Sequence, residues 1–148
     1  MKLMTNQSGF TLIEMLIALS LTTIILAISF SISLKTYDTF QYQAFIEQFD
    51  KDLLYLQQLA MTKHENYYLH FERQQNRYQI RKGGLGTNII ERSYPPKWEI
   101  EPVTLKLPIQ FSPKGNLHKP GTLKIKTDYS VYFIICPFGK GRCYDYKT

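Results

Sequence analysis

Residues 9–34 read GFTLIEMLIALSLTTIILAISFSISL, and Glu14 is the one charged residue among them. A helix of about 20 apolar residues is long enough to cross the hydrocarbon core of a bilayer. After Gly9 the stretch contains no proline or glycine that would interrupt a helix. We therefore expect residues 10–34 to form one apolar helix that can span a membrane.

Glu14 is out of place in this helix, because an ionised carboxylate in apolar surroundings needs a partner or takes up a proton. The preceding residues, MKLMTNQSG, form a short polar leader. An ordinary secretory signal fits poorly, since its small-residue cleavage site follows the apolar region. Cleavage between Gly9 and Phe10 would instead create a new α-amino group, a cation able to meet the Glu14 carboxylate of a neighbouring subunit.

The polar leader, the Gly9-Phe10 pair, Glu14 and the uninterrupted apolar run together resemble the type IV prepilin signature. The resemblance implies that a membrane-embedded prepilin peptidase cuts after Gly9 and N-methylates Phe10. It also implies that Glu14 guides assembly of subunits into a filament. The rival interpretation is a simple signal anchor with an incidental glutamate, which would face a membrane partner or reach the interface.

A second pattern follows Leu34, where apolar residues recur every three or four positions, as they do on one face of a helix. Polar residues such as Glu47, Asp50 and Asp52 fill the gaps and are expected to face solvent. We expect one helix from about Thr11 to Lys63, whose second half is amphipathic. Its apolar stripe consists of Tyr42, Phe45, Ile46, Phe49, Leu53, Leu56 and Ala60.

Beyond Glu65 the apolar residues alternate, which indicates strands separated by Gly- and Pro-containing turns. Short strands with turns between them favour an antiparallel meander packed on the helix, an α+β fold. The sequence thus predicts a leader (1–9), an apolar helix (10–34), its amphipathic continuation (35–64) and an antiparallel β head (65–148). The expected strands are 67–71, 78–80, 88–92, 97–100, 105–111, 122–126 and 130–136.

Cys136 and Cys143 are the only cysteines, and Gly139 and Gly141 between them allow the chain to turn. We expect a disulfide that pins the last hairpin, because a head outside the membrane lies in an oxidising compartment. The alternative is a pair of reduced cysteines acting as small apolar residues. A zinc site is not expected, since no second Cys/His pair has metal-ligand spacing.

The small Tyr-rich basic head, the short leader and the cysteine hairpin resemble a minor pseudopilin of Gram-positive competence pili, of the ComGD type. Phe111, Gly115 and Gly121-Thr122 are similar to a Phe/Gly/Gly-Thr signature of minor pseudopilin heads. The resemblance implies a role in DNA uptake, other pseudopilins as partners, and a single-pass location with the head outside. A type II secretion pseudopilin and a signal-anchored extracellular binding domain are the alternatives.

Lysine and arginine number 18 against 12 acidic residues, a formal charge of +6 that suits an anionic partner or simple solubility. Direct DNA contact is a separate hypothesis, since cations that neutralise phosphates give salt-dependent binding. The candidate contacts are Arg73, Arg77, Arg81, Lys82, Lys124 and Lys126.

Catalysis is not expected. The three histidines, His64, His70 and His118, are dispersed, and no nucleophile lies in a recognised turn motif. Gly83-Gly84 lacks the strand-to-helix context of a dinucleotide site, so we expect a turn there and no cofactor.

Overall fold

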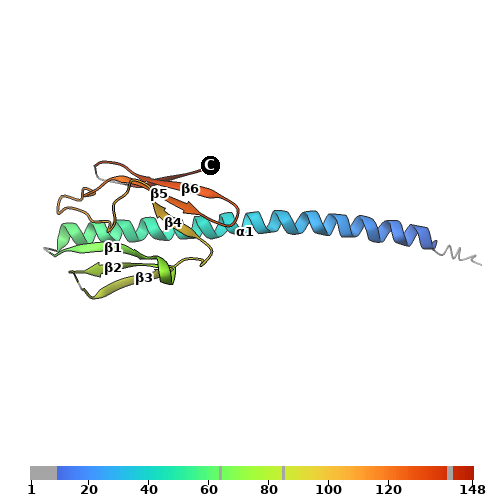
Figure 1. Ribbon diagram of the computed structural model, residues 1–148, viewed down its shortest axis with the longest axis horizontal. Coiled ribbons are helices and arrows are strands. Elements are labelled where there is room, and N and C mark those ends of the chain that lie inside the picture. The colour runs from blue at the N-terminus through green and yellow to red at the C-terminus, as the bar shows by residue number, and fades with distance from the viewer. Residues whose placement is uncertain (1–9, 64, 85, 140–141) are drawn as a thin grey trace, which may run out of the picture. The chain divides into compact units, whose positions relative to one another are not determined.

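The computed structural model describes residues 10–63, 65–84, 86–139 and 142–148, without the side chains of residues 29–33. The expected leader, including Gly9, lies outside the described residues. In these residues one long helix is followed by seven strands. Figure 1 shows the strands beside the C-terminal part of this helix. The chain divides after Tyr37 into two compact units, and the second, from Asp38 to Thr148, is the head.

The helix α1 runs from Leu12 to Thr62, 51 residues in all, within one residue of the expected bounds. In the part of α1 that belongs to the first unit, large apolar side chains are exposed, among them Leu12, Ile17 and Ile24. Three hydroxyls bond to carbonyls one turn back: Ser20 to Ile17, Thr22 to Leu19 and Thr23 to Ser20. Within the residues described, no helix combines the length and the apolar character that crossing a membrane requires.

The part of α1 that belongs to the head buries the predicted apolar stripe. Tyr42, Phe49, Leu53, Leu56 and Ala60 are each at most 6% exposed. Phe45 and Ile46 are partly buried and pack against the same core. The 3.6-residue period of the helix therefore gives the correct buried face.

The first sheet contains β1 (Tyr67–Glu72), β2 (Arg77–Lys82) and β3 (Asn88–Ser93), all antiparallel. A short 3-10 helix, Arg73–Gln75, joins β1 to β2, and Asn76 closes this turn with a φ of 49°. Asparagine is one of the few residues that adopt this left-handed conformation readily. The predicted hairpin is confirmed, and so is the strand that follows it.

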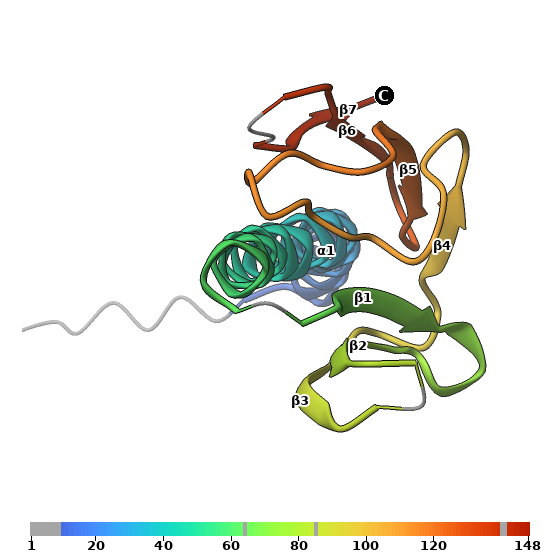
Figure 2. The same ribbon diagram turned by 90° about the vertical axis from the view of Figure 1, so that its left-hand side faces the viewer.

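The second sheet contains β4 (Glu99–Pro102), β5 (Gly121–Lys126), β6 (Val131–Cys136) and β7 (Tyr144–Lys147), in that order. Leu123, Ile125 and Ile134 have no exposed surface. Figure 2, which looks along α1, shows the first sheet on one side of the head and the second sheet on the other, both beside the helix. The core lies between the helix and the inner faces of both sheets.

Three expectations about strands are wrong. The head has two sheets rather than one meander, and residues 105–111 form no strand. Pro108 lacks the N–H that a ladder needs, so this segment makes only an isolated bridge from Ile109 to Leu69 and another from Phe111 to Leu117. The fourth strand begins at Glu99 rather than Lys97, and β7 was not expected.

Candidate functional site

Thr11 and Glu14 form a reciprocal cap at the start of α1. The Glu14 amide donates to Thr11 Oγ1 at 3.4 Å, and the Thr11 amide donates to Glu14 Oε2 at 3.3 Å. Threonine before a helix with glutamate three residues later is the capping-box spacing. The Thr11-x-x-Glu14 spacing could have predicted this contact, which sequence reasoning missed. Glu14 thus fixes the helix start as well as bringing a negative charge to it.

Asp52, expected to face solvent, is buried at 3% exposure. The Tyr78 hydroxyl donates to Asp52 Oδ2 at 2.8 Å, and Arg92 Nε donates to the same oxygen at 3.2 Å. Gln48 Nε2 donates to Asp52 Oδ1 at 3.0 Å. Burial, followed by the hydrogen bond to Asp52, raises the pKa of Tyr78. The expectation failed because helical period does not reveal which polar residue finds partners on the strands; here β2 and β3 supply them.

Tyr42 links α1 to the last two strands. Its ring stacks on that of Tyr132 at 3.4 Å between centroids, and its hydroxyl donates to Asp145 Oδ2 at 3.0 Å. Burial, followed by the charge of Asp145, raises the pKa of Tyr42 and also that of Asp50. The unexpected strand β7 therefore has two attachments. The Tyr42 hydrogen bond ties it to the helix, and its backbone pairs with β6.

Cys136 and Cys143 form a disulfide, with Cα atoms 4.2 Å apart. Cys136 is the last residue of β6, and β7 begins directly after Cys143. Cys136 is 1% exposed, so the bond is anchored in the core. The bond closes the loop that joins these strands, which is the role expected for it.

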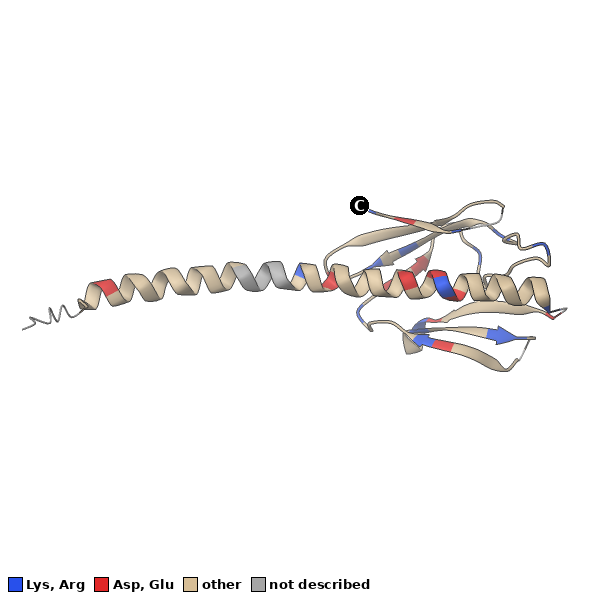
Figure 3. Ribbon diagram, turned by 180° about the vertical axis from the view of Figure 1, so that it is seen from behind, with Lys and Arg blue, Asp and Glu red and all other residues tan. Residues whose placement is uncertain are grey.

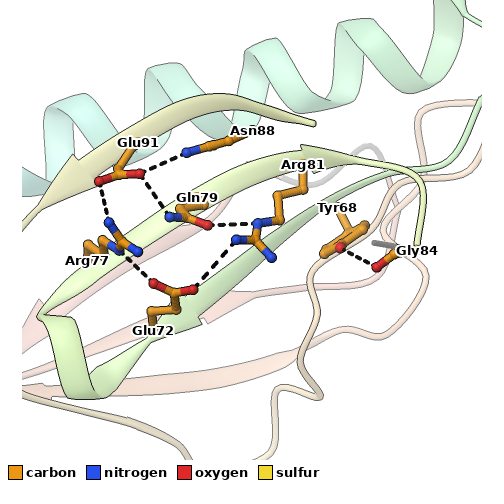
Figure 4. Close-up of polar contacts among 8 residues, drawn as sticks. All are labelled: Tyr68, Glu72, Arg77, Gln79, Arg81, Gly84, Asn88 and Glu91. Atoms are coloured by element: carbon orange, nitrogen blue, oxygen red, sulfur yellow. Dashed lines mark hydrogen bonds and ion pairs between the residues drawn. The ribbon is translucent and has the colours of Figure 1, made fainter. Parts of the chain in front are cut away.

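The outer face of the first sheet carries a network of paired charges, drawn in Figure 4. Arg77 binds Glu72 and Glu91, each at 2.6 Å. Arg81 lies 3.6 Å from Glu72 and donates to Gln79 at 2.7 Å. Gln79, only 2% exposed, donates in turn to Glu91 at 2.9 Å. Two arginines and two glutamates cancel in formal charge across this face.

The remaining strand cations of the proposed DNA contact also have carboxylate partners. Lys82 lies 2.7 Å from Glu65, Lys124 lies 3.3 Å from Glu101, and Lys126 lies 3.1 Å from Glu99. Figure 3 shows cationic and acidic segments on neighbouring strands.

Arg73 differs, because it makes no ion pair with any described residue; it lines a cavity of about 470 Å³ with His70 and Leu107. The structure therefore does not gather the six candidates into one unpaired basic surface.

Gly115 and Gly121 have structural reasons to be glycine. Gly115 has a φ of +78°, and a Cβ there would lie 2.9 Å from Met61 Sδ. A Cβ on Gly121 would lie 2.4 Å from the Leu105 backbone nitrogen. The Thr122 carbonyl accepts hydrogen bonds from the amides of residues 103, 104 and 105. The lack of a Cβ at Gly121 thus allows residues 103–105 to lie against the start of β5.

No group of three or more His, Cys, Asp or Glu side chains able to hold a metal ion occurs among the described residues. His70 and His118 line separate cavities. The hydrogen bonds and ion pairs described above are made within the chain, whereas the large apolar side chains from Phe10 to Ile28 are exposed.

Comparison with known proteins gives two matches and one absence. Residues 4–30 match the family described as "Prokaryotic N-terminal methylation motif". The chain is 31% identical over 139 residues to "Competence protein ComGD" of Bacillus subtilis (strain 168), which covers 94% of this chain and 93% of that protein. No solved structure matches the chain.

Proposed function

The chain belongs to the ComGD family of competence pseudopilins, and we propose that it is a minor subunit of a type IV-like filament that takes up DNA during transformation. The observation that carries the proposal is the similarity to ComGD along nearly the whole chain, head included. The methylation motif alone fits secretion pseudopilins and surface pilins equally well. The full-length similarity is what favours competence over the type II secretion alternative and over a signal-anchored binding domain.

Processing and assembly give each N-terminal residue a role. Prepilin peptidase cuts after Gly9 and methylates Phe10, and the leader 1–9 is lost. The side chains of residues 29–33 are not described, and the proposed membrane pass rests on the sequence of residues 10–34, where Glu14 is the one charged residue. This segment holds the subunit in the membrane as a single pass, with the head outside, and then packs among the helices of other pseudopilins. Exchange of lipid contacts for helix contacts keeps the exposed apolar side chains of this segment out of water.

Glu14 sets the axial register of the subunit. Its carboxylate pairs with the Phe10 amine of a neighbouring subunit, and pairing of two charges in apolar surroundings strongly favours one offset over others. The position of Glu14 supports this role, because it lies in the first turn of α1, four residues from the Phe10 amine that processing would create. The rest of α1, as far as Thr62, continues the helix and carries the β head, which presents surfaces to partners.

The work of this subunit is mechanical, and we propose no catalytic step and no cofactor. Filament growth and retraction move material through the envelope. Direct DNA contact by Arg73, Arg77, Arg81, Lys82, Lys124 and Lys126 stays a prediction. Five of these six cations already have carboxylate partners, which lowers their capacity to neutralise phosphates.

The test is a clean deletion of the gene in a naturally transformable host. We expect transformation to be lost and to return when the wild-type chain is supplied in trans, with secretion of proteins into the medium unchanged. Normal transformation in the deletion strain would overturn the proposed function. A general secretion defect would point to the type II secretion alternative.

A further inference from the structure

Residues 103–127 contain no acidic residue but carry the five lysines Lys106, Lys114, Lys119, Lys124 and Lys126. Lys124 and Lys126, on β5, pair with Glu101 and Glu99 of β4. Lys114 and Lys119 lie on the loop that precedes β5, and both are exposed. Neither makes an ion pair with any residue that the structure describes. This loop is therefore more basic than the strands beside it.

The loop is fixed against the C-terminal end of α1. Its turn is closed by the Gly115 amide, which donates to the Ser112 carbonyl at 2.8 Å, and by the Asn116 amide, which donates to Ser112 Oγ at 3.1 Å. Gln57 of α1 donates from Nε2 to the Gly115 carbonyl at 2.6 Å. The backbone that carries Lys114 is thus held in place on the helix rather than left to move freely.

A cavity of about 260 Å³ lies at the same place, lined in part by Lys63, Asn66, Gln110 and His118. Lys63 follows the last residue of α1, is exposed, and makes no ion pair among the described residues. Lys114 directly follows Pro113 and Lys119 directly follows His118, and both of these neighbours line the cavity.

Glu65 is the acidic residue of the cavity lining, and it is already engaged. Its carboxylate lies 2.7 Å from Lys82 Nζ and accepts a hydrogen bond from the Tyr67 hydroxyl at 3.0 Å. Lys82 pairs directly with Glu65, and Lys63 also interacts electrostatically with that carboxylate. Four lysines, Lys63, Lys82, Lys114 and Lys119, against one glutamate leave three net positive charges at this end of the head. The side-chain amides of Asn66 and Gln110 and the imidazole of His118 add hydrogen-bonding groups to the lining. Figure 3 shows the cationic segments of the loop beside this end of α1.

We propose that Lys63, Lys114 and Lys119, the end-lysine cluster, bind the phosphodiester backbone of duplex DNA. The proposal rests on the proposed function in competence and names the contact site within it. A phosphate that approaches Arg77 or Lys124 competes with a carboxylate that already holds the cation. A phosphate that approaches the end-lysine cluster displaces no carboxylate from an ion pair, since Lys63 only interacts with Glu65 through its charge. Counterion release then favours binding. The contact surface is thus the loop at the end of α1 rather than the outer faces of the sheets.

The test uses the processed full-length protein in detergent and a fluorescent DNA duplex, with binding followed by anisotropy over a salt series. The test variant is Lys63→Gln/Lys114→Gln/Lys119→Gln. The matched control is Lys97→Gln/Lys124→Gln/Lys126→Gln, which removes the same number of charges from lysines with carboxylate partners. At about 0.9 per phosphate contact, we expect the test variant to reduce the slope of log affinity against log salt by roughly 2.7. The control should retain most of the wild-type slope.

Equal loss in both triple variants would overturn the proposal, since net charge rather than this cluster would then explain binding. So would failure of the wild-type protein to bind. A soluble polyglycerol phosphate that displaces DNA at equal phosphate concentration would also count against it, because wall polymer would then be the ligand. A transformation assay distinguishes this failure from failure of the proposed function. If only the DNA contact is wrong, cells that carry the test variant transform normally, whereas cells that lack the gene do not.

Discussion

Replacing Glu14 with glutamine is expected to lower incorporation of the subunit into filaments about a hundredfold, while cleavage at Gly9 continues. Removing one partner of a charge pair in apolar surroundings costs about 3–5 kcal/mol, and each 1.4 kcal/mol is tenfold in an equilibrium constant. We expect an effect at the low end of this range, because water at the membrane surface can solvate the Phe10 amine before assembly. The measurement is the ratio of this subunit in sheared filaments to that in membranes.

The helix cap provides the matched control for this experiment. Glutamine retains the acceptor oxygen that the Thr11 amide needs but lacks the charge. Thr11→Val removes the hydroxyl that accepts from the Glu14 amide but retains the Glu14 charge. Loss of such a cap costs about 1 kcal/mol, so this variant should assemble nearly normally. If Thr11→Val is as defective as Glu14→Gln, the role of Glu14 is capping and the intersubunit charge pair is wrong.

Replacing Asp52 with alanine is expected to destabilise the head by about 3 kcal/mol, because a buried hydroxyl and a guanidinium lose their common partner. Tyr78 is 1% exposed, so its hydroxyl has no access to solvent in the folded head. Arg92 keeps part of its hydration, since 45% of its side chain is exposed. A loss of this size lowers the thermal midpoint of a small domain by about 10 °C. Near-ultraviolet circular dichroism of the processed protein measures it.

Glu47→Ala is the control for Asp52, since it also removes one carboxylate from the head part of α1. Glu47 pairs with Lys51 at 3.8 Å, and their side chains are 76% and 68% exposed. Exposed pairs of this kind contribute at most about 1 kcal/mol. A midpoint that falls equally in both variants would mean that Asp52 stabilises the head no more than a surface charge does.

Local pattern predicted α1 well, because its signals lie within the helix itself. Apolar spacing located the buried stripe, and the absence of proline and glycine allowed 51 continuous helical residues. The burial of Asp52 was not predictable in this way, since its partners Tyr78 and Arg92 come from strands far along the chain. A polar side chain can be buried when donors from distant parts of the chain form hydrogen bonds with it. The spacing of apolar residues along the helix contains no information about such donors.

Most strands of the head were predicted from the sequence, but their division into two sheets was not. Alternation located β1 and β2, and the Pro- and Gly-containing turns helped to locate β3, β5 and β6. No strand was expected at β7, all four residues of which are exposed. Its position depends on the Cys136–Cys143 bond, the pairing with β6 and the Tyr42 contact. Charge counting likewise favoured the strand cations for DNA contact, because sequence does not show which of them lie beside a carboxylate.

The central claim is that the chain matures as a pilin, and its N-terminus tests that claim most directly. Intact mass and N-terminal analysis should be compared in cells with and without prepilin peptidase. We predict a chain that starts at N-methylated Phe10 only where the peptidase is present. A chain that keeps MKLMTNQSG in both strains would contradict the account and leave a signal-anchored binding domain as the better description.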